Sequence, residues 1–162
     1  MEYIYVGKIV NTHGIKGEIR ILSNFDLKEE VFKKNVNIYI GDQKIKEVIN
    51  SYRHHKNYEM ITLEGYTNIN EVLKFKNKKV YINREEIQSL NDKILKFDII
   101  GMKAFVDEKE IGIVNDIYNT GINYEVFEII NGKEKKLIPY HKDFIESISK
   151  ENNKIIFKGG ML

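Results

Sequence analysis

Short runs in which apolar and polar residues alternate fill most of the chain and predict β-strands. Val36, Ile38 and Ile40 fall on every second position, and the apolar residues of segment 18–21 do the same. A period of two places one set of side chains on each face of a strand, so these segments are expected to be half-buried. Turn residues separate the runs, and Asn131-Gly132 is the strongest hairpin signal among them. Many short strands at regular spacing favour closed or nearly closed β structure.

The expected strands form two series along the chain. The first series spans about residues 4–10, 18–21, 36–40, 43–53, 58–63 and 80–82, and the second about 102–106, 111–118, 124–130, 136–139, 144–148 and 154–157. Two short helices interrupt the first series, one with a capping box that begins at Asp26 and one that begins at Asn68 with Glu71 as its partner. Gly7 stands where the apolar parity shifts, which predicts a β-bulge that helps the sheet to curl.

Residues 83–97 break the strand pattern and divide the chain. They contain two adjacent glutamates and a polar stretch at 89–93, between the two strand series. A chain of 162 residues is long enough for two small domains. The sequence therefore predicts a mainly β protein of two small β-barrels, with one domain over residues 1–83, a short linker over 84–97 and a second domain over 98–162.

Composition excludes several classes of function. The chain has 26 basic and 24 acidic residues, a formal net charge of +2, so any contact with nucleic acid is expected to be local or shared with a protein partner. It has no cysteine, which excludes disulfides, thiol catalysis and cysteine-ligated zinc. No apolar run approaches the roughly 20 residues of a membrane span, and no basic region leads into an apolar helix after Met1. We expect a cytoplasmic protein without a membrane partner.

The most informative stretch is a glycine-containing loop between the first two expected strands. His13, Gly14, Lys16 and Gly17 lie in this loop, and Arg20 follows on the next strand. The two glycines allow positive φ angles and the close approach of another backbone, so that His13 and Lys16 project from a tight rim loop. Such a loop either binds a partner or RNA, or closes a hairpin of the barrel with no further role. These five residues are the first candidate site.

The second candidate site is the densest basic cluster, at a predicted hairpin tip. Arg53, His54 and Lys56 stand there, and the two positively charged side chains suit the phosphates of RNA. The alternative is a solvated turn, since charge at hairpin tips is ordinary. Adjacent histidines raise the question of a metal, but zinc needs three or four converging ligands and no partner spacing is visible. We therefore expect no metal site.

The sequence contains no catalytic motif that we recognise. Glu85-Glu86 is a pair of neighbouring carboxylates, but neighbours along a strand point to opposite faces, which argues against joint acid–base work. Nothing resembles a phosphate-binding glycine loop with its lysine or a nucleophile elbow. Neither an enzymatic activity nor a cofactor is expected.

Several segments, taken in their order, resemble the RimM family of ribosome maturation factors. They are Gly-Lys-Ile-Val at 7–10, His-Gly-Ile-Lys-Gly-Glu-Ile-Arg at 13–20, and further matches at 63–65, 70–72, 80–82, 98–102, 112–114, 137–139 and 160–162. The resemblance covers nearly the whole chain. It implies a six-stranded N-terminal barrel like those of translation factors, followed by a PRC-type β-barrel, and a non-enzymatic accessory role in late assembly of the small (30S) ribosomal subunit.

The resemblance also implies partners. It predicts binding to the free or immature 30S subunit through a protein of the subunit head, small-subunit protein nineteen, and through nearby 16S rRNA whose processing the protein supports. A monomer is expected. Two other functions remain open: a stand-alone RNA-binding barrel protein that needs no protein partner, and a metabolic enzyme that uses the barrel mouth.

A third candidate site is the apolar segment of Ile94, Leu95 and Phe97. The RimM family commonly places a pair of tyrosines or similar aromatics just before its Asp-Leu-x-Gly element, where they help partner binding. Here Ile94 and Leu95 occupy those positions, so the segment stays apolar but has no phenolic hydroxyls. It either packs between the two domains or forms a protein-docking patch.

Overall fold

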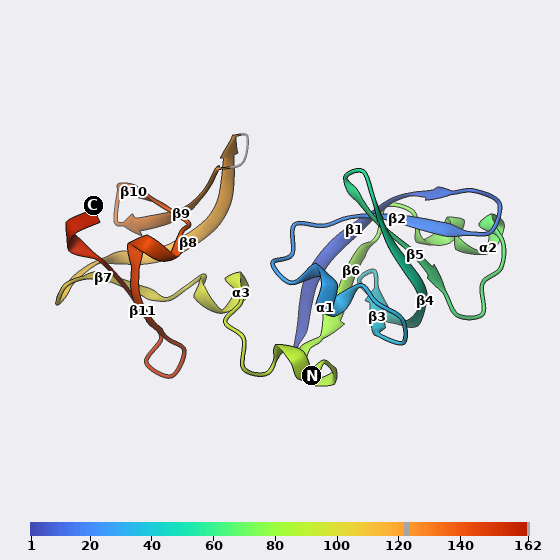
Figure 1. Ribbon diagram of the computed structural model, residues 1–162, viewed down its shortest axis with the longest axis horizontal. Coiled ribbons are helices and arrows are strands. Elements are labelled where there is room, and N and C mark those ends of the chain that lie inside the picture. Colours follow the sequence, from blue (N-terminus) through green and yellow to red (C-terminus); the bar gives the residue numbers. More distant parts are fainter. Residues whose placement is uncertain (122–123, 162) are drawn as a thin grey trace. The chain divides into compact units, whose positions relative to one another are not determined.

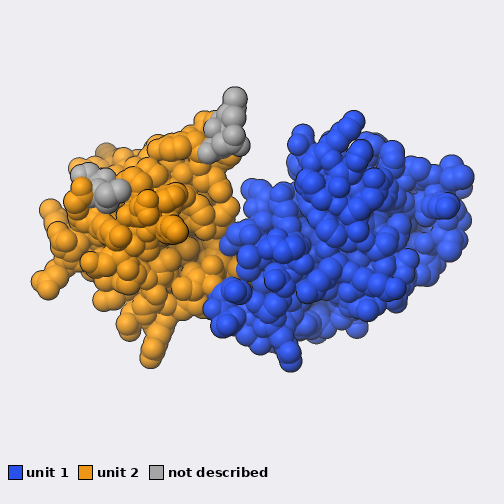
Figure 2. All heavy atoms as spheres, viewed as in Figure 1, with its two compact units in different colours: residues 1–93 blue, residues 94–162 orange. Residues whose placement is uncertain are grey.

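The protein was analysed as a computed structural model that describes residues 1–121 and 124–161. The chain divides into two compact units, Met1–Lys93 and Ile94–Leu162, which Figure 2 colours separately. Both units are built mainly from β-strands, as the alternating sequence pattern predicts. Among the described residues, no helix is long and apolar enough to cross a membrane.

Unit 1 contains a closed six-stranded barrel (Figure 1). Its strands are β1 (Tyr3–His13), β2 (Glu18–Leu22), β3 (Asn37–Ile40), β4 (Ile45–His55), β5 (Tyr58–Leu63) and β6 (Lys79–Asn83). They follow the order β1-β2-β5-β4-β3-β6, and β6 pairs with β1 to close the ring. Every neighbouring pair is antiparallel. The expectation of a six-stranded N-terminal barrel is confirmed.

The bulge predicted at Gly7 is present. The register between β1 and β6 shifts between Tyr5 and Gly7. A Cβ at position 7 would lie 2.7 Å from the Ile21 side chain and 2.9 Å from the Leu22 carbonyl oxygen, so only glycine fits here. A bulge raises the local twist, which helps a sheet to close on itself.

One of the two predicted helix starts is correct. Helix α2 (Ile69–Val72) has Asn68 at its N-cap, and Asn68 and Glu71 form a complete capping box. Helix α1 (Lys28–Val31) instead begins two residues after Asp26, with Leu27 at the N-cap and no side-chain hydrogen bond there. The capping box predicted at Asp26 is therefore wrong. Three 3-10 helices complete unit 1: η1 (Leu73–Phe75), η2 (Arg84–Glu86) and η3 (Gln88–Leu90).

Residues 84–93, which the sequence analysis assigned to the linker, pack within unit 1. Ile87 and Leu90 are buried, and Arg84 donates a hydrogen bond of 2.9 Å to the carbonyl oxygen of Lys93. The domain limits 1–83 and 98–162 remain predictions.

Unit 2 is a six-stranded sheet with the order β10-β9-β8-β7-β12-β11. Its elements are α3 (Lys96–Ile99), β7 (Lys103–Val106), β8 (Lys109–Gly121), β9 (Tyr124–Asn131), β10 (Glu134–Pro139), η4 (Lys142–Phe144), β11 (Ile145–Ser149), β12 (Lys154–Phe157) and η5 (Gly159–Met161). Strands β7 and β12 are parallel, and the other pairs are antiparallel. The Asn131-Gly132 hairpin joins β9 to β10 as predicted, with Gly132 at φ 63°.

Aromatic side chains fill the centre of unit 2. Phe127 is fully buried, and its ring centroid lies 5.0 Å from that of Tyr140 and 5.1 Å from that of Phe157. Aliphatic side chains from β7, β8, β9 and β12 surround this cluster. The sheet thus has one buried face, which fixes the register of its strands.

Candidate functional site

The glycine loop is held against the start of helix α2. The backbone N–H of Ile69 donates to the carbonyl oxygen of Ile15 over 3.0 Å. Gly17 has φ +84°, and a Cβ there would lie 2.9 Å from the carbonyl oxygen of Asn68. Gly14 also has positive φ, at +72°, but open space surrounds it. The capped helix therefore supports the loop, and Gly17 permits the contact.

The tip of this loop is exposed. Lys16 is exposed and Ile15 is 83% exposed. An apolar side chain this exposed buries little within its own chain, so it contributes little to folding and is accessible to a partner. The sequence predicts four site residues in this loop and gives no signal that singles out Ile15.

Arg20 connects the loop to the neighbouring strands. Its guanidinium lies 2.8 Å from Nδ1 of His13 and 5.6 Å from the ring centroid of Tyr58. A guanidinium can only donate, so Nδ1 of His13 is the acceptor in this contact when the imidazole is neutral. The contact orients both side chains on the outer surface of the barrel.

The basic hairpin turns at Lys56-Asn57, with Lys56 at φ 56°. Arg53 donates two hydrogen bonds, of 2.8 and 2.7 Å, to the carboxylate of Glu18 on β2. This pairing lowers the pKa of Glu18, chiefly through the hydrogen bonds from Arg53, and raises the pKa of Arg53. The positive charge of Arg53 is thus partly compensated before any ligand binds.

His55 lies in the middle of the cationic side chains. Burial lowers its pKa first, and the charges of Arg53, Lys56, His13 and Arg20 lower it further. These four groups come from both predicted sites, the loop and the hairpin. The structure therefore brings the two sites together on one surface.

We call this surface the basic face; it lies on the outer side of β2, β5 and β4 and includes His13 at the end of β1. Its members are His13, Arg20, Arg53, His55 and Lys56. Met60 pairs with Arg20 on one side and with Arg53 on the other, and it is fully buried. Cross-strand partners share a face, so the two arginines flank a covered methionine. Both arginines therefore project from paired strands of the barrel, which fix the positions of their side chains.

His54 belongs to a different environment. Strand alternation turns it away from Arg53, and its Nδ1 lies 2.9 Å from Oε1 of Glu59. Glu59 is almost completely buried, and it also accepts a hydrogen bond of 2.7 Å from Tyr52, whose pKa burial and this bond raise to about 12. Lys28 lies 3.9 Å from the other oxygen of Glu59. The three hairpin residues named from the sequence are thus divided between two sites.

The apolar segment near the start of unit 2 is also divided. Ile94 is 43% exposed and Phe97 is 51% exposed, whereas Leu95 is fully buried. The backbone N–H of Leu95 donates to Asp98 over 2.8 Å and fixes the first turn of α3. Leu95 cannot contact a partner from this position, and the exposed apolar side chains of the segment are Ile94, Phe97 and Ile100.

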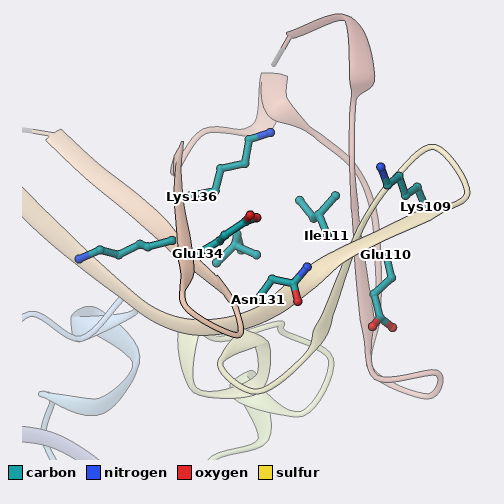
Figure 3. Close-up of a pocket in the computed structure, with 8 residues that line it drawn as sticks. Lys109, Glu110, Ile111, Asn131, Glu134 and Lys136 are labelled. Atoms are coloured by element: carbon teal, nitrogen blue, oxygen red, sulfur yellow. The ribbon is translucent and has the colours of Figure 1, made fainter.

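An open hollow in unit 2 is lined by β8, β9 and β10 (Figure 3). Lys109 and Glu110 come from β8, and Glu134 and Lys136 come from β10. The side chains of Glu110 and Glu134 point in different directions, so they form no carboxylate pair. Within residues 1–121 and 124–161, no group of three or more histidine, cysteine or acidic side chains converges as metal ligands.

Comparison with known proteins assigns both halves of the chain. Residues 4–87 match the model of the RimM N-terminal domain, and residues 96–161 match that of the RimM PRC barrel domain. The chain is 37% identical to a ribosome maturation factor RimM from Exiguobacterium sp. AT1b over 160 residues, which covers 96% of this chain and 93% of that one. It is 41% identical to the RimM of Ligilactobacillus salivarius over 162 residues, with coverages of 98% and 96%.

Among solved structures, the chain is similar to a RimM crystal structure from Pseudomonas aeruginosa, described as a 16S ribosomal RNA processing protein. That likeness covers 97% of both chains at 20% identity with a TM-score of 0.49. The two domain matches and the full-length relatives agree with each other in order and extent. The chain belongs to the RimM family of ribosome maturation factors, and its role lies in ribosome biogenesis.

Proposed function

We propose that this protein assists late assembly of the small ribosomal subunit by binding, without making or breaking a covalent bond. The observation that carries the proposal is the convergence of the glycine loop and the basic hairpin on one rigid face of the barrel. Membership in a family of maturation factors supplies the ribosomal context. The protein acts as a monomer in the cytoplasm and needs no cofactor.

The RNA partner in this proposal is 16S rRNA in the head region of the subunit. Arg20, Arg53 and Lys56 present donors to phosphate oxygens, and Lys16 extends the positive surface to the loop tip. The chain as a whole carries a net charge of only +2, so the attraction is concentrated on this face. Phosphate contacts of this kind position a protein on RNA without reading its sequence.

The protein partner in this proposal is small-subunit head protein nineteen. Ile94 and Phe97 supply exposed apolar surface at the start of unit 2, and Leu95 anchors that segment from the core. Large apolar side chains that become desolvated on binding are the usual anchors of an interface. A pull-down with the purified head protein tests this contact directly.

A maturation factor favours one state of its target only by binding that state more tightly. We therefore expect higher affinity for free or immature 30S subunits than for complete ribosomes, in a sedimentation assay with purified particles. Lys16→Glu weakens the association without unfolding the barrel, because Lys16 is exposed. Lys133→Glu is the matched control: it makes the same charge change on an exposed lysine in unit 2. Equal affinity for both particles contradicts the proposal.

The alternative function is that of a stand-alone RNA-binding barrel protein. It is favoured by the basic face alone, which needs no protein contact. In that case binding to purified RNA falls steeply with salt, because counterion release scales with the number of phosphates contacted, and the head protein adds nothing.

A further inference from the structure

A second surface of the barrel combines tyrosines with lysines. Tyr5 on β1 pairs with Tyr81 on β6, and Tyr81 pairs with Tyr39 on β3. Three tyrosines therefore form one row across three adjacent strands. Tyr3, on the same face of β1, packs against Tyr39 with ring centroids 5.1 Å apart. We call the surface of these four tyrosines the tyrosine face.

The rings differ in how they are used by the fold. Tyr39 is only 5% exposed and donates a hydrogen bond of 2.6 Å to Glu86, so its ring is a fixed, buried part of the fold. Tyr5 is 46% exposed and lies edge-on to Tyr81, with centroids 6.0 Å apart. Tyr81 and Tyr3 are half-buried. Tyr39 thus packs against Tyr3, and Tyr81 against Tyr5, while part of the surface of the outer rings stays open to solvent.

Lysine side chains lie over these open rings. The ammonium of Lys44 is 4.1 Å from the centroid of Tyr81 and 5.8 Å from that of Tyr3, and the ammonium of Lys79 is 6.0 Å from that of Tyr5. Lys46 pairs with Tyr39 and extends the row onto β4. A cation over an aromatic ring gains only a small attraction at an exposed site. Each ammonium can therefore leave its ring at little cost when an anion and a flat apolar group arrive together.

We propose that the tyrosine face binds an unpaired segment of RNA, with bases stacked on Tyr5 and Tyr81 and phosphates held by Lys79 and Lys44. The chemistry favours this ligand because a single strand offers flat π-faces and regularly spaced negative charges to the same surface. In a double helix the bases are stacked on one another, so only its phosphates can interact with this surface, through the lysines. The choice of RNA rests on the proposed function.

This surface is separate from the basic face. The tyrosine face lies on β6, β3 and the first residues of β1 and β4, whereas the basic face lies on β2, β5 and the last residues of β1 and β4. The barrel order places β6 and β3 on the side of the ring opposite β2 and β5. The two faces differ in chemistry as well, because the basic face holds arginines around a histidine and the tyrosine face exposes ring surface. An RNA strand on the tyrosine face is therefore bound through base stacking as well as through charge.

The test uses the full chain and a fluorescein-labelled unpaired RNA of twelve nucleotides, with binding followed by anisotropy. Tyr5→Leu removes the ring and weakens binding at least about fivefold, whereas Tyr5→Phe keeps the ring and stays within about twofold of the unchanged protein. Tyr124→Leu is the matched control, because Tyr124 is 50% exposed in unit 2. An abasic strand of the same length binds weakly and equally to the unchanged protein and all three variants.

Lysine variants give an independent readout. Lys79→Gln lowers the slope of log affinity against log salt by about 0.7, the value for one phosphate contact on a single strand. The chain has no tryptophan but ten tyrosines, so the part of the tyrosine quenching on RNA addition that is lost in Tyr5→Leu reports the ring of Tyr5.

Unchanged affinity of Tyr5→Leu, or equal affinity of the protein for duplex and single strand, overturns the inference. If that happens while the protein still sediments with free small subunits, only the tyrosine face is wrong and the proposed function stands. If sedimentation fails as well, the proposed function fails with it.

Discussion

Arg53 on β4 reaches over strand β5 to hold Glu18 on β2, with both of its hydrogen bonds shorter than 3 Å. Arg53 is 49% exposed, so solvent screens this pair, and its net contribution to the free energy of unfolding is about 0–1 kcal/mol. Its larger effect is on binding, because Glu18 competes with any phosphate for the same guanidinium.

Glu18→Gln is therefore expected to strengthen binding to RNA. Removing one unit charge about 4 Å from the phosphate is worth about 1 kcal/mol in water, or about fivefold in affinity at low salt. Anisotropy titrations with labelled RNA at two salt concentrations measure it. Glu134→Gln in unit 2 is the control for net charge alone, and an equal gain in that variant shows that the Arg53 pairing is irrelevant.

The two loop glycines are expected to differ in their tolerance of alanine. Gly14→Ala meets open space and costs about 1–2 kcal/mol for the left-handed backbone alone. Gly17→Ala adds a clash with the Asn68 carbonyl oxygen and should destabilise the protein by clearly more. Urea unfolding of both variants compares the two losses. Similar free energies of unfolding contradict the supporting role of helix α2.

Ile15→Ser tests whether the loop tip serves binding or folding. Because Ile15 is 83% exposed, the free energy of unfolding should change by less than about 0.5 kcal/mol. Association with free small subunits should weaken. A variant that loses stability but binds normally shows that Ile15 belongs to the fold.

His55 should make the protein less stable in mild acid. Its pKa in the folded chain lies below the unfolded value of about 6.5, because burial and neighbouring cations disfavour the charged ring. Between these two values the unfolded chain binds more protons, so stability falls as pH drops from above 6.5 towards the folded pKa. Urea unfolding at several pH values should show a smaller decline for His55→Gln than for the unchanged protein. A direct NMR titration of His55 gives the sign independently.

Leu95→Asp and Phe97→Asp should separate folding from docking. The first places a charge at a fully buried position and should cost several kcal/mol of stability. The second changes a side chain that is 51% exposed, and it should leave the melting temperature nearly unchanged while abolishing pull-down of the head protein. Normal pull-down by Phe97→Asp removes this residue from the docking surface.

Features set by neighbours in sequence were predictable. The capping box at Asn68 and the bulge at Gly7 depend on residue types within a few positions, and both are present. The start of α1 was not predictable in the same way. Asp26 has the right spacing for a capping box, but the N-cap of the helix is Leu27, one residue later.

Contacts that depend on the order of the strands in the barrel could not be predicted from the sequence. Glu18 and Arg53 meet only because β5 pairs with both β2 and β4, an arrangement that no local pattern encodes. The separation of His54 from Arg53 does follow from strand alternation, and its partner Glu59 lies directly opposite it in the β4–β5 hairpin, but the burial of Glu59 depends on the rest of the barrel. Leu95 likewise shows no signal that distinguishes it from its exposed neighbour Ile94.

The parallel pairing of β7 with β12 has a consequence for synthesis. Strand β12 lies inside the sheet, between β7 and β11, and is made about fifty residues after its neighbour β7. At ordinary translation speeds that is a wait on the order of several seconds. The barrel of unit 1 has all its strands once β6 is made, so the nascent chain carries a complete barrel while β7 of unit 2 still lacks its partner β12.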